Sequence, residues 1–186
     1  MSKSVLIIGG KPSNYNLREL FEKYDIICRI NFNMKYKKKT EKDIFFLNNH
    51  LYFNTVKQRT KPEELKKHPY SFVDLKVLED FHNMLNNNEY GEIIKQYESG
   101  RNKISNGILE KLKCPHKFLK APRCGYQAIL YFLMNNYDVT IFGFSRENNN
   151  DGTYYNDKKP SSAHDFNSEM KILNWLIENK IIKIIE

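Results

Sequence analysis

His164 is the residue of this chain best suited to act as a general base. It lies at the start of the last segment with helical apolar spacing, which the sequence predicts to begin near the capping residues Ser161 and Ser162. In the first turn of a helix, the dipole disfavours the imidazolium ion and leaves a neutral ring nitrogen able to accept a proton. A lone histidine on a helix is more often structural than catalytic, so the assignment depends on its neighbours.

Three loops that could bind an anionic ligand each follow a predicted β-strand. In an open α/β sheet these loops meet at the carboxyl edge of the strands, where helix N-termini present unpaired N–H groups. The first loop lacks the GxGxxG spacing, and no GxxxxGK[ST] sequence occurs in the chain, which disfavours NAD and ATP. The polar or glycine positions of the three loops are Gly9, Gly10 and Ser13, then Asn31, then Gly143.

Strands and helices alternate along the sequence, which predicts an α/β fold with a central, mostly parallel sheet flanked by helices. The length of 186 residues fits a single Rossmann-like domain over residues 1–186. The expected strands are residues 5–8, 25–30, 43–47, 117–119, 138–144 and 181–185. The expected helices are residues 16–24, 75–85, 90–97, 126–135 and the last one, with Phe166, Met170, Leu173, Leu176 and Ile177 on one face.

The three cysteines, Cys28, Cys114 and Cys124, do not have the spacing of a metal site, so we expect no metal. No segment has the pattern of a signal peptide or a membrane span, which predicts a soluble, cytoplasmic protein. The net charge of +8 permits a polyanionic partner, including the periphery of a membrane. The densest basic run, Lys35–Lys42, lacks the aromatic interleaving of a base-stacking surface, so we expect no specific nucleic acid.

Four segments together resemble the conserved motifs of the family 29 and family 42 sialyltransferases. VLIIGGKPSN with DIICRIN is similar to their first motif, and APRCGYQAILYFLMNNYDVTIFGF to their second. GTYYND resembles the third motif, and HDFNSE matches the His-x4-Glu motif. The four segments occur in the order found in the family, over the first and last parts of the chain.

The resemblance implies a sialyltransferase variant of the GT-A-like fold and a metal-independent, inverting transfer. The donor would be a CMP-activated sugar, such as sialic acid, and the acceptor a glycan hydroxyl. His164 would be the general base, while Tyr154 and Tyr155 would approach the phosphate. The donor site implied by the resemblance comprises Gly9, Gly10, Ser13, Asn31, Arg123, Cys124, Gly125 and Gly143.

Four positions depart from the family pattern and leave the donor open. Gly10 stands where the family usually has asparagine, Arg123 and Cys124 replace a Ser/Thr pair, and Thr153 replaces a histidine. One alternative is a transferase or hydrolase that acts on a different nucleotide-sugar. Another is a non-enzymatic basic module that binds nucleotides or nucleic acid.

Overall fold

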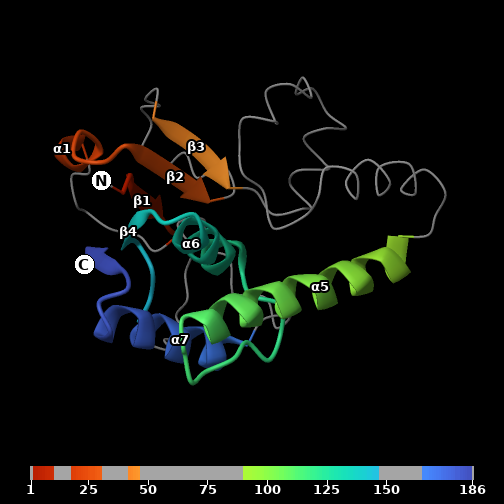
Figure 1. Cartoon of the computed structure of the whole chain (residues 1–186). Helices are drawn as coiled ribbons and strands as arrows, with labels where there is room; N and C mark the ends of the chain where they lie inside the picture. The colour runs from red at the N-terminus through yellow and green to blue at the C-terminus, as the bar shows by residue number, and fades with distance from the viewer. Residues whose placement is uncertain (1, 11–17, 31–41, 47–89, 147–164, 186) are drawn as a thin grey trace.

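The fold is built on a five-stranded parallel β-sheet (Figure 1). The computed structural model describes residues 2–10, 18–30, 42–46, 90–146 and 165–185. The strands lie in the order β3-β2-β1-β4-β5, and every neighbouring pair is parallel. Their bounds are Ser4–Ile8 (β1), Ile26–Ile30 (β2), Asp43–Phe46 (β3), Asp138–Phe142 (β4) and Lys183–Ile185 (β5). The predicted α/β fold with a parallel sheet is therefore confirmed.

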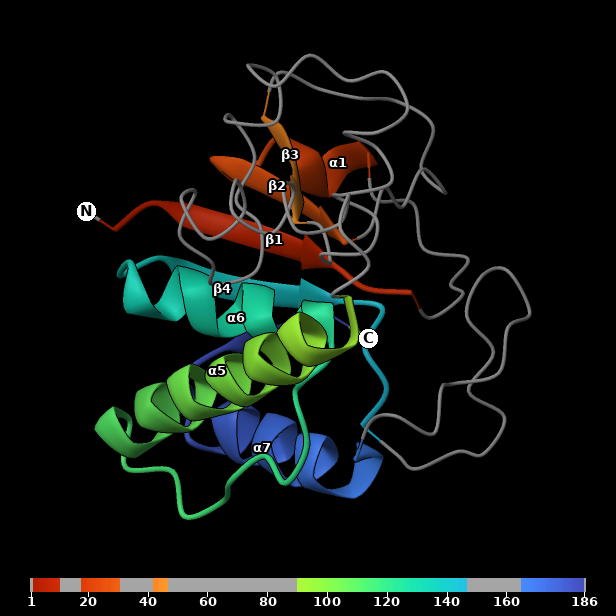
Figure 2. The same cartoon turned by 90° about the vertical axis from the view of Figure 1, so that its right-hand side faces the viewer.

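Helices cover both faces of the sheet (Figure 2). Alternate residues of β1 divide between two hydrophobic cores, as the twofold repeat of a strand requires. Val5 and Ile7 pack with the larger core, to which α5, α6 and α7 contribute, whereas Leu6 and Ile8 pack with Phe21 of α1. The helices are Arg18–Phe21 (α1), Tyr90–Lys111 (α5), Cys124–Met134 (α6) and Phe166–Glu178 (α7).

A side-chain contact at the amino edge of the sheet joins β1 to the turn before β2. Asp25 accepts hydrogen bonds from the backbone N–H of Ser4 (2.7 Å) and from the Ser4 hydroxyl (2.8 Å). These bonds lower the pKa of the Asp25 carboxyl, since they favour its ionised form. The contact supports the register in which Val5 lies beside Ile26.

The structure corrects the predicted start of the last helix. Asp165, rather than Ser161 or Ser162, is the N-cap, because its carboxylate accepts hydrogen bonds from the N–H groups of Asn167 (3.2 Å) and Ser168 (3.3 Å). The two serines lie outside the described residues.

The predicted strand at residues 117–119 was also wrong. This segment belongs to the connection between α5 and α6. There the backbone N–H and carbonyl of Phe118 form hydrogen bonds with the Asn106 side chain instead of with a neighbouring strand. The α5 helix extends well beyond the predicted residues 90–97, and the predicted helix at 75–85 lies outside the described residues. No helix in the described ranges is long and apolar enough to cross a membrane.

Candidate functional site

The candidate site lies at the carboxyl edge of β1 and β4. Strand β1 is central, with β2 on one side and β4 on the other, so the connections that leave these strands diverge. Such a point of divergence in a parallel sheet is the usual position of a ligand crevice. Figure 2 shows that α6 and α7 both begin on the side to which β1 and β4 point.

Three of the predicted glycines meet at this edge around Phe144, which follows Gly143. The N–H of Gly9 donates to the carbonyl of Phe142 (2.7 Å), so the chain continues along β4 for one residue beyond β1. A Cβ atom on Gly9 would lie 2.5 Å from the carbonyl oxygen of Gly143 and 2.9 Å from the Phe144 ring. A Cβ on Gly125 would lie 3.0 Å from the same ring. The Gly143 backbone and the Phe144 ring therefore leave no space for a Cβ atom at position 9, whereas a Cβ atom at position 125 would require only a small shift of the ring.

The backbone at position 143 requires glycine for a different reason. Gly143 has a φ of 71°, which places it in the left-handed region that side chains rarely adopt. The chain can therefore turn sharply at the end of β4 and bring Phe144 over the start of α6, where its ring packs edge-on against Tyr126 with centroids 6.2 Å apart.

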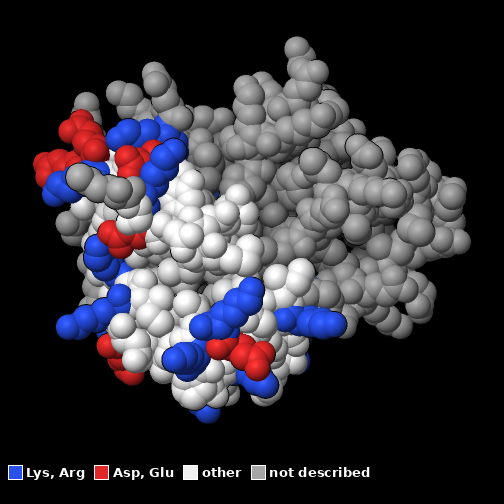
Figure 3. All heavy atoms as spheres, in the orientation of Figure 1, with Lys and Arg blue, Asp and Glu red and all other residues white. Residues whose placement is uncertain are grey.

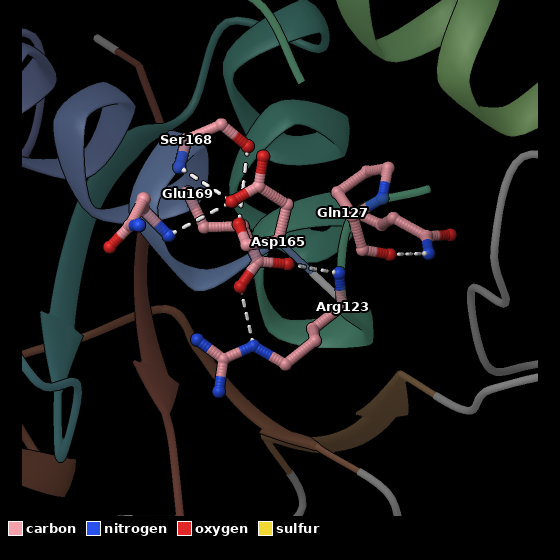
Figure 4. Close-up of polar contacts among 7 residues, drawn as sticks. Arg123, Gln127, Asp165, Ser168 and Glu169 are labelled. Atoms are coloured by element: carbon pink, nitrogen blue, oxygen red, sulfur yellow. Dashed lines mark hydrogen bonds and ion pairs between the residues drawn. The ribbon is translucent and has the colours of Figure 1, made fainter. Parts of the chain in front are cut away.

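A buried carboxylate joins the starts of α6 and α7 (Figure 4). Glu169 accepts a hydrogen bond from the backbone N–H of Arg123 (2.7 Å) and another from its Nε atom (2.5 Å). The Glu169 side chain is 2% exposed, whereas that of Arg123 is 27% exposed. The Arg123 guanidinium also lies over the ring of Phe166, 4.4 Å from the centroid. These contacts fix the position of Arg123 at the edge of the site.

Burial raises the pKa of the Glu169 carboxyl, although the charge of Arg123 and its two hydrogen bonds act in the opposite direction. Both hydrogen bonds from Arg123 go to carboxylate oxygens, as expected for an ionised acceptor. The raised pKa means that Glu169 becomes protonated at a higher pH in the folded protein than in the unfolded chain.

No side chain of the described residues caps the first turn of α6. The N-cap residue of this helix is Arg123. The N–H groups of Cys124 and Gly125 form no hydrogen bond with the described residues. Such N–H groups at the positive end of a helix dipole favour an anion. The adjacent cation of Arg123 adds to this preference.

The thiol of Cys124, unlike its backbone N–H group, is buried in the core. Cys124 is 8% exposed, and its Sγ atom donates to the carbonyl of Phe46 at 3.4 Å. Burial raises the pKa of this thiol far above its ordinary value, so it remains neutral within the core. A ligand at this edge would meet the backbone of Cys124 rather than its side chain.

Gln127 adds a buried polar group one turn into α6. Its Nε2 atom donates to the carbonyl of Pro122 (2.7 Å), which helps hold the segment that leads into the helix (Figure 4). Its Oε1 atom is buried and has no hydrogen-bond partner among the described residues. The Gln127 side chain is thus buried beside the first turn of α6 and is only partly satisfied by the described residues.

The structure brings together only part of the predicted site. Gly9, Gly125 and Gly143 converge, Gly10 follows Gly9 directly and is partly buried, and Arg123 and Cys124 lie at the start of α6. His164 was predicted to lie in the first turn of the last helix. This was wrong, because α7 begins after its N-cap Asp165 and His164 precedes that cap in the sequence. Ser13, Asn31, Tyr154, Tyr155 and His164 lie outside the described residues.

Sequence reasoning missed two residues that organise this edge. Phe144 is the ring against which two glycines pack, and its signal is an aromatic residue directly after a glycine at a strand end. Glu169 was noticed only as the end of the HDFNSE motif. The sequence signal for Glu169 is its spacing: it lies four residues before Leu173 and seven before Leu176, both buried. This spacing places Glu169 on the buried face of the helix.

Comparison with protein-family models, with curated proteins and with solved structures found no match for this chain. Among the described residues, no group of three histidine, cysteine, aspartate or glutamate side chains could hold a metal ion.

The Glu169 contact makes a testable prediction for stability. Glu169→Ala should lower the free energy of unfolding by about 1–3 kcal/mol, because it removes both acceptors of Arg123 from a buried position. Glu169→Gln should lower the free energy of unfolding by less, since the amide oxygen of glutamine can still accept a hydrogen bond from the Arg123 N–H. Urea denaturation of both variants and the wild type measures the difference.

The same comparison at several pH values tests the electrostatics of this contact. Because the folded pKa is raised, the contribution of Glu169 to stability is present below its unfolded pKa and lost as the pH rises through its folded pKa. The wild type should therefore lose stability relative to Glu169→Gln as the pH increases from 4 to 7, a window spanning the ordinary glutamate pKa of about 4.3. A relative gain over this range would show that the pairing with Arg123 outweighs burial.

Proposed function

We propose that this chain is a sialyltransferase-like enzyme that transfers a sugar from a CMP-activated donor to a glycan hydroxyl. The observation that carries the proposal is the meeting of Gly9, Gly125 and Gly143 beside the uncapped start of α6. These glycines come from the two segments that resemble the first and second sialyltransferase motifs. Segments far apart in the sequence thus meet at the edge where a nucleotide would bind.

The topology supports a Rossmann-like arrangement as part of this proposal. The order β3-β2-β1-β4-β5 corresponds to the first five strands of the dinucleotide-binding order 3-2-1-4-5-6. Helices on both faces of the sheet also belong to this class, in which the ligand binds beside the central strand. The fold would then present the donor phosphate to backbone N–H groups rather than to a metal.

The electrostatics at the start of α6 suit a nucleotide monophosphate. The N–H groups of Cys124 and Gly125 and the charge of Arg123 would stabilise the negative charge that develops on CMP as it leaves. Glu169 would act as a positioning residue, because it holds Arg123 at this edge by two hydrogen bonds. The buried carboxylate would itself make no contact with the donor.

In the proposed reaction, His164 removes the proton of the acceptor hydroxyl. The hydroxyl oxygen then forms a bond to the anomeric carbon of the donor sugar, and the bond from that carbon to the CMP oxygen breaks with inversion. Tyr154 and Tyr155 would meet the phosphate. His164 directly precedes Asp165, the N-cap of α7, and Glu169 ties α7 to the start of α6.

The first test is nucleotide selectivity. CMP should raise the melting temperature more than AMP, UMP or NAD, because a ligand that binds only the folded state adds about 2.7 kcal/mol at 100 times its Kd. Thermal denaturation with each nucleotide in the absence of magnesium measures this preference. Equal shifts with UMP, or no shift with any cytidine nucleotide, would count against a CMP donor.

The second test is the role of the base. His164→Ala should lower the rate of transfer, or of slow donor hydrolysis, by about 10²–10⁴-fold, because that is the usual contribution of general-base catalysis. CMP affinity and melting temperature should remain near those of the wild type. His116→Ala, in the connection between α5 and α6, is the matched control. A stable His164→Ala protein with wild-type turnover would exclude this residue as the base.

A further inference from the structure

The connection between α5 and α6 exposes lysines and an aliphatic side chain. Residues 111–120, here called the basic loop, comprise the last residue of α5 and most of the connection to α6, and contain four lysines and no acidic residue. All four are exposed, and Leu119 is 76% exposed, more than any other large hydrophobic side chain whose exposure the structure describes. Figure 3 shows lysine and arginine side chains along the lower margin, where Figure 1 places this loop, with a smaller acidic group beside them. The lysines are Lys111, Lys113, Lys117 and Lys120.

The basic loop is held firmly by the residue next to Leu119. Phe118 is 2% exposed, and its ring packs edge-on against Tyr126 with centroids 6.0 Å apart. Its N–H donates to the Asn106 side chain at 2.8 Å, and its carbonyl accepts from the same side chain at 3.1 Å. The inward anchor at Phe118 therefore keeps Leu119 at the surface, and no ordering of the loop is needed for binding.

We propose that the basic loop docks on the surface of an anionic lipid membrane. Lysines close to such a surface are attracted by its negative potential, while an exposed aliphatic side chain gains by entering the interface. The loop provides both features within one short, fixed segment. Glu110, exposed in the last turn of α5, is the acidic residue nearest to the basic loop in the sequence, and the net charge of the two together is still positive.

Charge alone would also suit a nucleic acid, but the other features favour the membrane. Binding to single strands uses aromatic side chains on which bases stack. The aromatic residue of the loop, Phe118, is buried, and the exposed residue beside it is a leucine. An aliphatic side chain gains nothing from a phosphate backbone, whereas it is the group that a lipid interface accommodates.

Vesicle sedimentation tests the proposal on the full chain. We expect binding to phosphatidylcholine vesicles that contain phosphatidylserine, no binding to phosphatidylcholine alone, and weaker binding as salt rises. Lys113→Gln with Lys117→Gln should lower the partition coefficient by about 25-fold, on the basis of about fivefold for each lysine. Leu119→Ser should lower it by about tenfold or more, because the aliphatic side chain no longer enters the interface.

Matched variants away from the loop provide the controls. Lys3→Gln with Lys23→Gln removes two exposed lysines outside the loop, one at the chain start and one beside α1, and Met134→Ser removes an exposed apolar side chain at the end of α6. These variants should bind like the wild type, and all variants should keep its melting temperature. Failure to bind the anionic vesicles, or an equal loss in the controls, would overturn the proposal. If the protein bound a single-stranded oligonucleotide but not the vesicles, the partner of the basic loop would be a nucleic acid and not a membrane.

Discussion

The contact between Glu169 and Arg123 fixes the arrangement on which the candidate site depends. Burying a carboxylate lowers the stability of a fold unless the charge is paired. Here the backbone N–H and the Nε atom of Arg123 both donate to the Glu169 carboxylate. Because Arg123 is the N-cap of α6 and Glu169 lies in the first turn of α7, the pair holds two helix starts at one edge of the sheet. The exposed part of the Arg123 guanidinium then remains at that edge. One interaction thus connects the packing of the helical layer to the electrostatics of the site.

Close packing around Phe144 is the second constraint on this edge. The Gly143 carbonyl and the Phe144 ring leave no space for a Cβ atom at Gly9, the ring is in tight contact with Gly125, and the backbone at Gly143 requires glycine through its dihedral angle. Glycine at these positions therefore has a structural cause that does not depend on a ligand. In the proposed reaction, binding would come instead from the N–H groups of Cys124 and Gly125 beside Arg123, which no side chain of the described residues caps. This distinction separates what the glycines do in the fold from what they contribute to the proposed reaction.

The sequence predicted the centre of the sheet because buried parallel strands are rich in apolar, β-branched residues, as in the continuous run at residues 5–8 and in Val139, Ile141 and Phe142 of β4. It failed where polar side chains decide the outcome. Serine and aspartate are both good caps, so local sequence could not choose Asp165 over Ser161 and Ser162 for α7. The partner of Glu169 is 46 residues away, a separation that no local pattern reveals. The backbone at Phe118 is likewise satisfied by a side chain of α5 rather than by a neighbouring strand.

The proposed donor site can be tested residue by residue with an NMR titration of the ¹⁵N-labelled protein with CMP. We expect the backbone amide signals of Gly9, Gly125 and Gly143 to shift together and with one binding constant, because these groups surround the same edge. The signals of Ser4 and Asp25, at the opposite edge of the sheet, should remain in place. Saturable shifts confined to any other surface, or an unchanged spectrum at high CMP concentration, would contradict a nucleotide site between β1 and β4.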